Sequence, residues 1–201
     1  MRNISEKKRI VIKLGSSTLA HKTGKLNIRR MQNLVRVIAD LQNSGKEIII
    51  VSSGSVALGT GKLGLRERPK DTPTRQAVAA IGQCELMHMY DNMFEKYSIT
   101  IAQILLTKTI IEKADRKKNV ENTIERLISL GVIPIVNEND TVSIDELELE
   151  IGENDSLAAM VANISNADLL LILSDIDGLY TSDPHINPDA EAIHTVDQIT
   201  D

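Results

Sequence analysis

The chain alternates short apolar runs, rich in β-branched residues, with longer segments of helical periodicity. Ile10–Leu14 and Ile48–Val51 are two such runs, and Ile28–Leu41 between them carries apolar residues at the spacing of one helix face. The same alternation predicts further strands at Ile99–Leu106, Val132–Val136 and Leu169–Leu173, and further helices at Thr74–Lys96, Asn119–Leu130 and Asp155–Ile164. Strands that are apolar on both faces and alternate with helices are typical of an α/β domain with a mainly parallel sheet.

Two segments depart from this alternation. Thr141–Ile151 alternates apolar with acidic residues, which predicts an exposed hairpin. Gly59, Gly61 and Gly64 have the spacing of a dinucleotide-binding loop, but they follow no strand and run into Pro69. They are therefore predicted to form a flexible loop.

Charge and composition exclude several classes of partner. The formal net charge is −5 and aromatic residues make up 2% of the chain, which argues against nucleic-acid binding and base stacking. The first apolar run stops at Lys13, too soon for a signal sequence or a membrane span. The single cysteine, Cys84, suits a reducing compartment, so we expect a cytoplasmic protein with no membrane partner.

Small and polar residues follow four of the expected strands. These strand ends are Lys13 with Gly15–Ser17, then Ser52–Gly54, Asn137–Asp140, and Ser174 with Asp175. Ligands of open parallel sheets bind beyond the carboxyl ends of the strands, and Gly and Ser let backbone N–H groups approach an anion. Each motif alone could be a solvated lysine or a helix cap. Their coincidence predicts a site for a phosphate and a carboxylate, with Lys13 as the cation.

The sequence shows no pattern of side chains typical of a metal site. The four histidines (His21, His88, His185, His194) are scattered without metal-ligand spacing, so no side-chain metal site is predicted. Asn154 and Asp155 stand where the expected hairpin meets the next helix. That position suits either hydrogen bonding to a polar ligand or capping of the helix.

Several of these motifs resemble the amino acid kinase family. Lys13–Ser17 looks like its nucleotide-binding opening, and Ser174–Pro184 resembles its later nucleotide loop. Three sharper signatures resemble the branch that phosphorylates the side-chain carboxylate of L-glutamate: Val51–Ala57, Ala79–Gln83, and Asn137–Asp140 with Gly152–Asp155. The resemblance covers nearly the entire chain, with the motifs in the expected order.

The resemblance implies a three-layer α/β/α sandwich that uses ATP with Mg²⁺. It implies formation of γ-glutamyl phosphate at the start of proline synthesis, inhibition by proline, and a homo-oligomer. Catalytic roles are implied for Lys13 and Asp155. ATP is expected at Lys13, Gly15, Ser16, Ser174 and Asp175, and glutamate at Ser53, Gly54, Asp140 and Asn154.

The expected chemistry needs no general base. A glutamate side chain has a pKa of about 4.3, so the nucleophile is already ionised at neutral pH. What remains is positioning and neutralisation of phosphoryl charge, by lysine, backbone N–H groups and Mg²⁺. Asp140 and Asn154 then make better sense as partners of the substrate ammonium and carboxylate than as catalysts.

The chain also departs from the family pattern. His185 stands where relatives often carry arginine, and the chain ends before a glycine-rich segment that supplies a second lysine in relatives. Residues 1–201 are therefore expected to be one kinase domain that is incomplete at its C-terminal end. Two alternatives stay open: another kinase of the family, for acetylglutamate or a nucleoside monophosphate, and a non-catalytic module that binds glutamate or proline.

Overall fold

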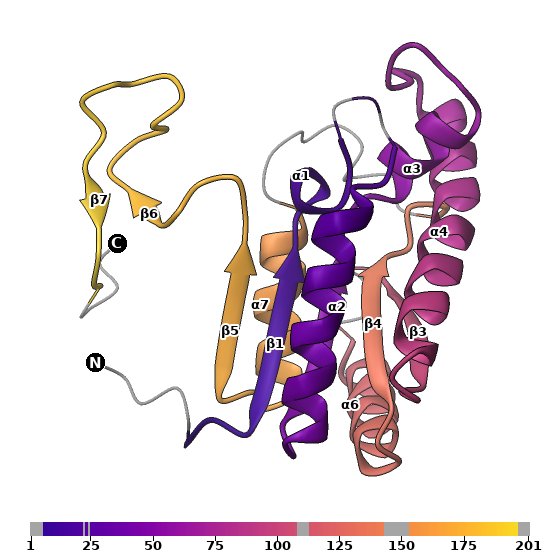
Figure 1. Cartoon of the computed structure of the whole chain (residues 1–201), viewed down its shortest axis with the longest axis vertical. Helices are drawn as coiled ribbons and strands as arrows, with labels where there is room; N and C mark the ends of the chain where they lie inside the picture. The colour runs from indigo at the N-terminus through magenta and orange to yellow at the C-terminus, as the bar shows by residue number, and fades with distance from the viewer. Residues whose placement is uncertain (1–5, 22, 24, 108–112, 143–152, 197–201) are drawn as a thin grey trace.

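A computed structural model describes residues 6–21, 23, 25–107, 113–142 and 153–196 (Figure 1). Within them the central sheet has the order β3-β4-β2-β1-β5, and all neighbouring strands are parallel. Its strands are β1 (Arg9–Leu14), β2 (Glu47–Ser52), β3 (Ile101–Leu106), β4 (Ile133–Glu138) and β5 (Leu169–Leu173). The helices are α1 (Ser16–Leu19), α2 (Ile28–Asn43), α3 (Ser55–Lys62), α4 (Thr72–Glu95), α6 (Ala114–Ser129) and α7 (Glu153–Ile164). The predicted α/β class with a mainly parallel sheet is confirmed.

The side chains of the strands alternate between two hydrophobic clusters, one on each face of the sheet. On β1, Ile10 and Ile12 pack in a cluster that includes side chains of α2 and α4. Val11 packs in the other cluster, with side chains of α6 and α7. In Figure 1, α2 and α7 accordingly lie on opposite sides of the sheet. Helices on both faces make the three-layer α/β/α sandwich that the family resemblance implied.

Helix boundaries follow local capping more than apolar periodicity. The side chain of Asn27 accepts a hydrogen bond from the backbone N–H of Arg30 and so caps α2, and Asp71 caps α4 through Thr74. α6 begins at Ala114, five residues before the expected start at Asn119. Its first turn is polar and exposed, so the apolar pattern gave no sign of it.

The predicted loop at Gly59 and Gly61 is wrong, because both glycines lie within α3. A Cβ atom on Gly59 would lie 2.0 Å from the carbonyl oxygen of Val78, and one on Gly82 would lie 1.7 Å from the carbonyl oxygen of Ser55. Glycine at these two positions lets the backbones of α3 and α4 touch. Close helix packing therefore overrides the low helix propensity of glycine.

The segment after β5 adds a short antiparallel pair, β6 (Leu179–Tyr180) and β7 (Ala192–Ile193), beyond the β5 edge of the sheet, at the left of Figure 1. The expected hairpin at Thr141–Ile151 falls on residues 143–151, which lie outside the described residues. No helix in the described part of the chain is long and apolar enough to span a membrane.

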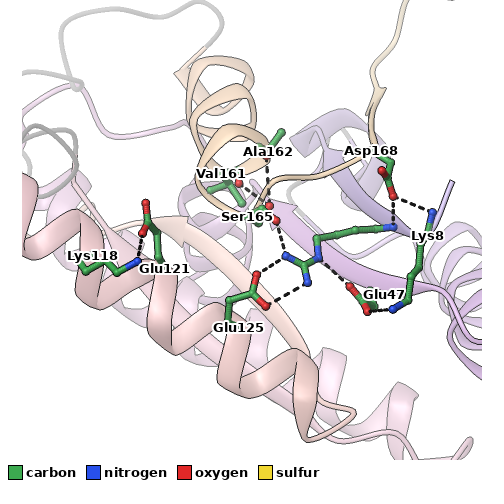
Figure 2. Close-up of polar contacts among 10 residues, drawn as sticks. Lys8, Glu47, Lys118, Glu121, Glu125, Val161, Ala162, Ser165 and Asp168 are labelled. Carbon is green, nitrogen blue, oxygen red and sulfur yellow. Dashed lines mark hydrogen bonds and ion pairs between the residues drawn. The ribbon is translucent and has the colours of Figure 1, made fainter.

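A network of ion pairs joins the amino ends of the strands, at the edge opposite the carboxyl ends (Figure 2). Arg9 pairs with Glu47 at 2.8 Å and with Glu125 of α6, and its guanidinium donates to the carbonyl of Ser165. Asp168 accepts hydrogen bonds from the backbone N–H groups of Lys8 and Arg9, both at 2.9 Å. The backbone hydrogen bonds lower the pKa of Asp168, and hydrogen bonds from Lys8 and Arg9 lower the pKa of Glu47. The network joins β1, β2 and α6 at the amino ends of the strands. It therefore lies away from the carboxyl ends, where ligands of parallel sheets bind.

Candidate active site

A pocket of about 560 Å³ opens at the carboxyl ends of the parallel strands. This volume is in the ordinary range for a small-molecule site. All ten residues to which the family resemblance assigns a role line it: Lys13, Gly15, Ser16, Ser53, Gly54, Asp140, Asn154, Asp155, Ser174 and Asp175. The structure therefore brings together residues that lie up to 162 positions apart in the sequence.

Lys13, near the end of β1, supplies a cation inside this pocket. Its side chain is 10% exposed, and its Nζ lies 2.6 Å from Oδ1 of Asp155 in the first turn of α7. The Asp155 side chain is 45% exposed. The pair holds the lysine ammonium in place, and Lys13 lines the pocket, where an anionic ligand could reach it.

Helix N-termini surround the pocket. α1, α3 and α7 all begin among its lining residues, so the first turns of these helices, whose backbone N–H groups lack helical partners, lie beside the pocket. Gly54 makes the turn into α3 with φ of +101°, a conformation that side chains other than glycine rarely adopt. The N–H of Gly15 donates to the carbonyl of Leu173 at 3.2 Å, which fixes the loop after β1 against β5.

Asn154 is held by hydrogen bonds to the ends of two strands. Its Nδ2 donates to the carbonyl of Ser52 at 3.2 Å and to Oγ of Ser53 at 2.5 Å. It also lies 3.4 Å from Oδ1 of Asn137. Ser52 in turn shares a 2.9 Å hydrogen bond with the hydroxyl of Tyr90, which is fully buried on α4. The side-chain amide is therefore fixed in position before any ligand binds.

Asp140 follows β4 and faces the N-terminus of α3. Its Oδ2 accepts a 2.8 Å hydrogen bond from the hydroxyl of Ser55, which is 4% exposed. This contact joins the end of β4 to the helix that begins after β2. It places a carboxylate beside Ser53 and Gly54, where a positively charged ligand group would find a partner.

The opposite wall of the pocket comes from the end of β5. There the hydroxyl of Ser174 donates to Oδ1 of Asp175 at 3.0 Å. This hydrogen bond, with smaller contributions from His185 and Lys13, lowers the pKa of Asp175. Asp175 is therefore a carboxylate at neutral pH, near the cation of Lys13.

Sequence reasoning missed several lining residues. Ser55 and Asn137 stand inside motifs that were singled out, yet no role was assigned to them; Ser17 and Glu138 line the pocket as well. Arg68 reaches the pocket from the segment between α3 and α4. The available signal was position inside a strand-end motif for Ser17, Asn137 and Glu138, and position inside the signature Val51–Ala57 for Ser55. Nothing in the sequence pattern indicated Arg68.

The donor set does not make a dedicated metal cage. No group of three or more His, Cys, Asp or Glu side chains that could hold an ion was found among the described residues. Mg²⁺ typically retains water and is bound by one or two carboxylates together with the substrate's phosphates. Asp155 and Asp175, both at the pocket wall, fit that kind of partial coordination.

Sequence comparison finds related proteins over most of the chain. The profile of the amino acid kinase family matches residues 8–200. A glutamate 5-kinase of Clostridium perfringens is 49% identical over 199 residues, covering 98% of this chain and 74% of that protein. A glutamate 5-kinase of Dehalococcoides mccartyi is 54% identical over 195 residues, covering 96% of this chain and 52% of that protein.

A solved structure agrees in fold. The product complex of an isopentenyl phosphate kinase from T. acidophilum superposes with a TM-score of 0.60 at 16% identity, covering 91% of this chain and 77% of that one. At that identity the likeness concerns architecture alone. The match over residues 8–200 and the identity to curated relatives decide the assignment: the chain belongs to the amino acid kinase family.

Proposed function

We propose that this chain transfers the γ-phosphoryl group of ATP to the side-chain carboxylate of L-glutamate, giving γ-glutamyl phosphate for proline synthesis. The observation that carries the proposal is the single pocket lined by all ten expected residues. Relatives named glutamate 5-kinase, at 47–54% identity, support the choice of substrate within the family.

The glutamate end of the site lies between β2, β4 and α7. Asp140 offers a carboxylate to the substrate ammonium, and the hydroxyl of Ser53 and the N–H groups beyond Gly54 suit the α-carboxylate. Asn154 contributes one further polar atom at the same end. A zwitterionic amino acid finds a partner for each of its charges here.

The nucleotide end lies between β1 and β5. Gly15 and Ser16 open α1 beside Lys13, and Ser174 and Asp175 follow β5. Backbone N–H groups at the loop after β1 suit the ATP phosphates, and Lys13 adds a cation. The side-chain carboxylate of glutamate would then meet the γ-phosphate near the Lys13–Asp155 pair.

The reaction moves no proton to an enzyme group. An ionised glutamate Oε forms a bond to the γ-phosphorus, and the bond from that phosphorus to the β,γ-bridging oxygen breaks. ADP leaves with the electron pair of the broken bond. Catalysis therefore depends on alignment and on neutralising charge on the transferred group, which is the role proposed for Lys13, oriented by Asp155.

Mg²⁺ would enter with ATP. Asp155 and Asp175 are the carboxylates that would hold it, and it would supply further positive charge to the transferred group. A cytoplasmic location, proline inhibition and a homo-oligomer are also proposals, and they rest on composition and on the family resemblance. That residues 1–201 form one kinase domain stays a prediction.

A ligand panel followed by thermal unfolding tests the substrate. L-glutamate at a hundred times its Kd is expected to add about 2.7 kcal/mol to the stability of the folded chain, a shift of a few degrees. Acetylglutamate, L-aspartate and a nucleoside monophosphate serve as comparisons. A shift with acetylglutamate or the nucleotide, and none with L-glutamate, would contradict the proposal and favour another substrate of the family.

A further inference from the structure

We propose that Gln83, on α4, is a positioning residue that stabilises the observed orientation of the Asn154 side-chain amide through Asn137. Its effect is to hold in place the hydrogen-bonding atoms that the site presents to the substrate. The inference rests on the proposed function, because it concerns how the glutamate end of the pocket is prepared. Gln83 itself is not among the residues that line the pocket.

The orientation of the Asn154 amide is set by the backbone carbonyl oxygen of Ser52, which can accept a hydrogen bond but cannot donate one. The backbone carbonyl of Ser52 lies 3.2 Å from Nδ2 of Asn154, so the NH₂ group and not the oxygen must face β2. The same NH₂ group donates to Oγ of Ser53 at 2.5 Å. Its two hydrogens serve three acceptors, and the 3.4 Å contact to Oδ1 of Asn137 is the longest.

That contact is favourable only if Asn137 turns its oxygen toward Asn154. With its oxygen there, Nδ2 of Asn137 points the other way and donates to Oε1 of Gln83 at 2.8 Å. Asn137 is 2% exposed, so water cannot readily replace this acceptor. A rotated Asn137 would set its NH₂ group against that of Asn154 and would lose its hydrogen bond to Oε1 of Gln83, so Gln83 stabilises the observed orientation.

The consequence is a fixed polarity at the glutamate end of the site. With its NH₂ group committed to the protein, Asn154 has Oδ1 left as an acceptor, and Ser53 retains a hydroxyl hydrogen to donate. An acceptor beside a donor matches the ammonium and carboxylate of a free amino acid. Gln83 thus favours binding of the zwitterion without touching it.

The test compares substitutions that differ in the acceptor at position 83. Gln83→Met keeps size and removes the acceptor, Gln83→Glu keeps an acceptor, and Gln83→Lys places a donor there. Gln42→Met is the matched control. Gln42 is likewise a half-buried helix glutamine with one amide contact, a 3.4 Å hydrogen bond to the carbonyl of Gly131 far from the pocket. KM for L-glutamate and for ATP, kcat, and the calorimetric Kd of L-glutamate are measured for each.

We expect Gln83→Met and Gln83→Lys to raise KM and Kd for L-glutamate about tenfold, the effect of losing one neutral hydrogen bond, and to leave KM for ATP unchanged. Gln83→Glu and Gln42→Met should stay within about twofold of wild type. Should Gln83→Met fail to fold, Gln83→Lys and Gln83→Glu give the same comparison.

The outcomes separate the inference from the proposed function. If wild type binds L-glutamate and both Gln83→Met and Gln83→Lys bind it equally well, the positioning role is wrong and the proposed function stands. If the variants lose thermal stability but retain the wild-type Kd, Gln83 is merely structural and the inference is overturned. If wild type binds no L-glutamate, the proposed function fails and takes the inference with it.

Discussion

The ammonium of Lys13 and the carboxylate of Asp155 lie 2.6 Å apart, joining the end of β1 to the first turn of α7. Both residues line the pocket, and in the proposed function the γ-phosphate of ATP and the side chain of glutamate would meet beside them. The ammonium of Lys13 can form an additional electrostatic interaction with an anionic ligand while Asp155 holds it in place. The proposed chemistry therefore depends on this contact more than on any other.

Replacing Lys13 with methionine should reduce turnover far more than binding. We expect Lys13→Met to lower kcat by about 10²–10³, because it removes a charge that stabilises the transferred group. The Kd of L-glutamate should change little, since the residues proposed to hold it lie elsewhere in the pocket. Lys62→Met is the control: Lys62 also pairs with an acid, Glu85, but on the exposed surface of α3. A kcat for Lys13→Met within twofold of wild type would remove Lys13 from the mechanism.

Gly82→Ala should destabilise the fold and disturb the glutamate end of the site. An added Cβ would lie 1.7 Å from the carbonyl oxygen of Ser55, so α3 and α4 must separate. We expect a loss of at least ~3 kcal/mol in urea unfolding, beyond ordinary overpacking because backbone must move. Gly178→Ala is the control, since a Cβ there meets nothing within 4 Å, and it should stay within ~0.5 kcal/mol. Equal stability of the two variants would show that the helices are not in this contact.

Tyr90→Phe should change how stability depends on alkaline pH. Burial raises the pKa of Tyr90 well above its ordinary value of about 10, despite the hydrogen bond with Ser52. Above pH 10 the unfolded chain releases this proton while the folded chain retains it, so stability falls as pH rises. Wild type should exceed Tyr90→Phe by ~0.5–1.5 kcal/mol at pH 8, and the difference should shrink above pH 10.

Urea unfolding of both proteins at several pH values measures that difference. Tyr97→Phe, which alters a tyrosine that is 38% exposed, should remain within ~0.5 kcal/mol of wild type at pH 8. A difference between wild type and Tyr90→Phe that stays constant up to pH 11 would contradict the burial of the Tyr90 hydroxyl.

The Arg9 network and the Lys118–Glu121 pair, both drawn in Figure 2, should differ in their contribution to stability. Arg9→Met removes the arginine partner of Glu125 and of the Ser165 carbonyl and leaves Glu47 with Lys8 alone, at a site where the arginine side chain is 15% exposed. We expect a loss of ~1–3 kcal/mol in urea unfolding. Lys118→Met breaks a surface pair with Glu121 in which the lysine is 68% exposed, and should lose less than ~0.5 kcal/mol. Similar losses for both variants would mean that the Arg9 network contributes no more than a surface pair.

Periodicity and strand-end chemistry predict most of this fold. Runs such as Ile48–Val51 identify the buried strands because parallel strands covered on both faces must be apolar throughout. The meeting of Lys13, Asp140 and Asp155 in one pocket follows from topology, since parallel strands end at one edge of the sheet.

Contacts between side chains of different elements could not be predicted in the same way. The helix through Gly59 depends on a 2.0 Å approach to the backbone of Val78 that periodicity does not record. The pairs Ser52–Tyr90 and Gln83–Asn137 join residues 38 and 54 positions apart, and nothing in their local sequence indicates which partner each would find. Position in a motif identified Ala79–Gln83 as significant without giving Gln83 a role.

Turnover of this chain with ATP, Mg²⁺, L-glutamate and hydroxylamine tests the central claim most directly. Hydroxylamine traps an acyl phosphate as a hydroxamate, so the account predicts γ-glutamyl hydroxamate and ADP in equal amounts, and neither product from Lys13→Met at a comparable rate. Binding of L-glutamate without ADP release, or hydroxamate formation from acetylglutamate but not from L-glutamate, would contradict it.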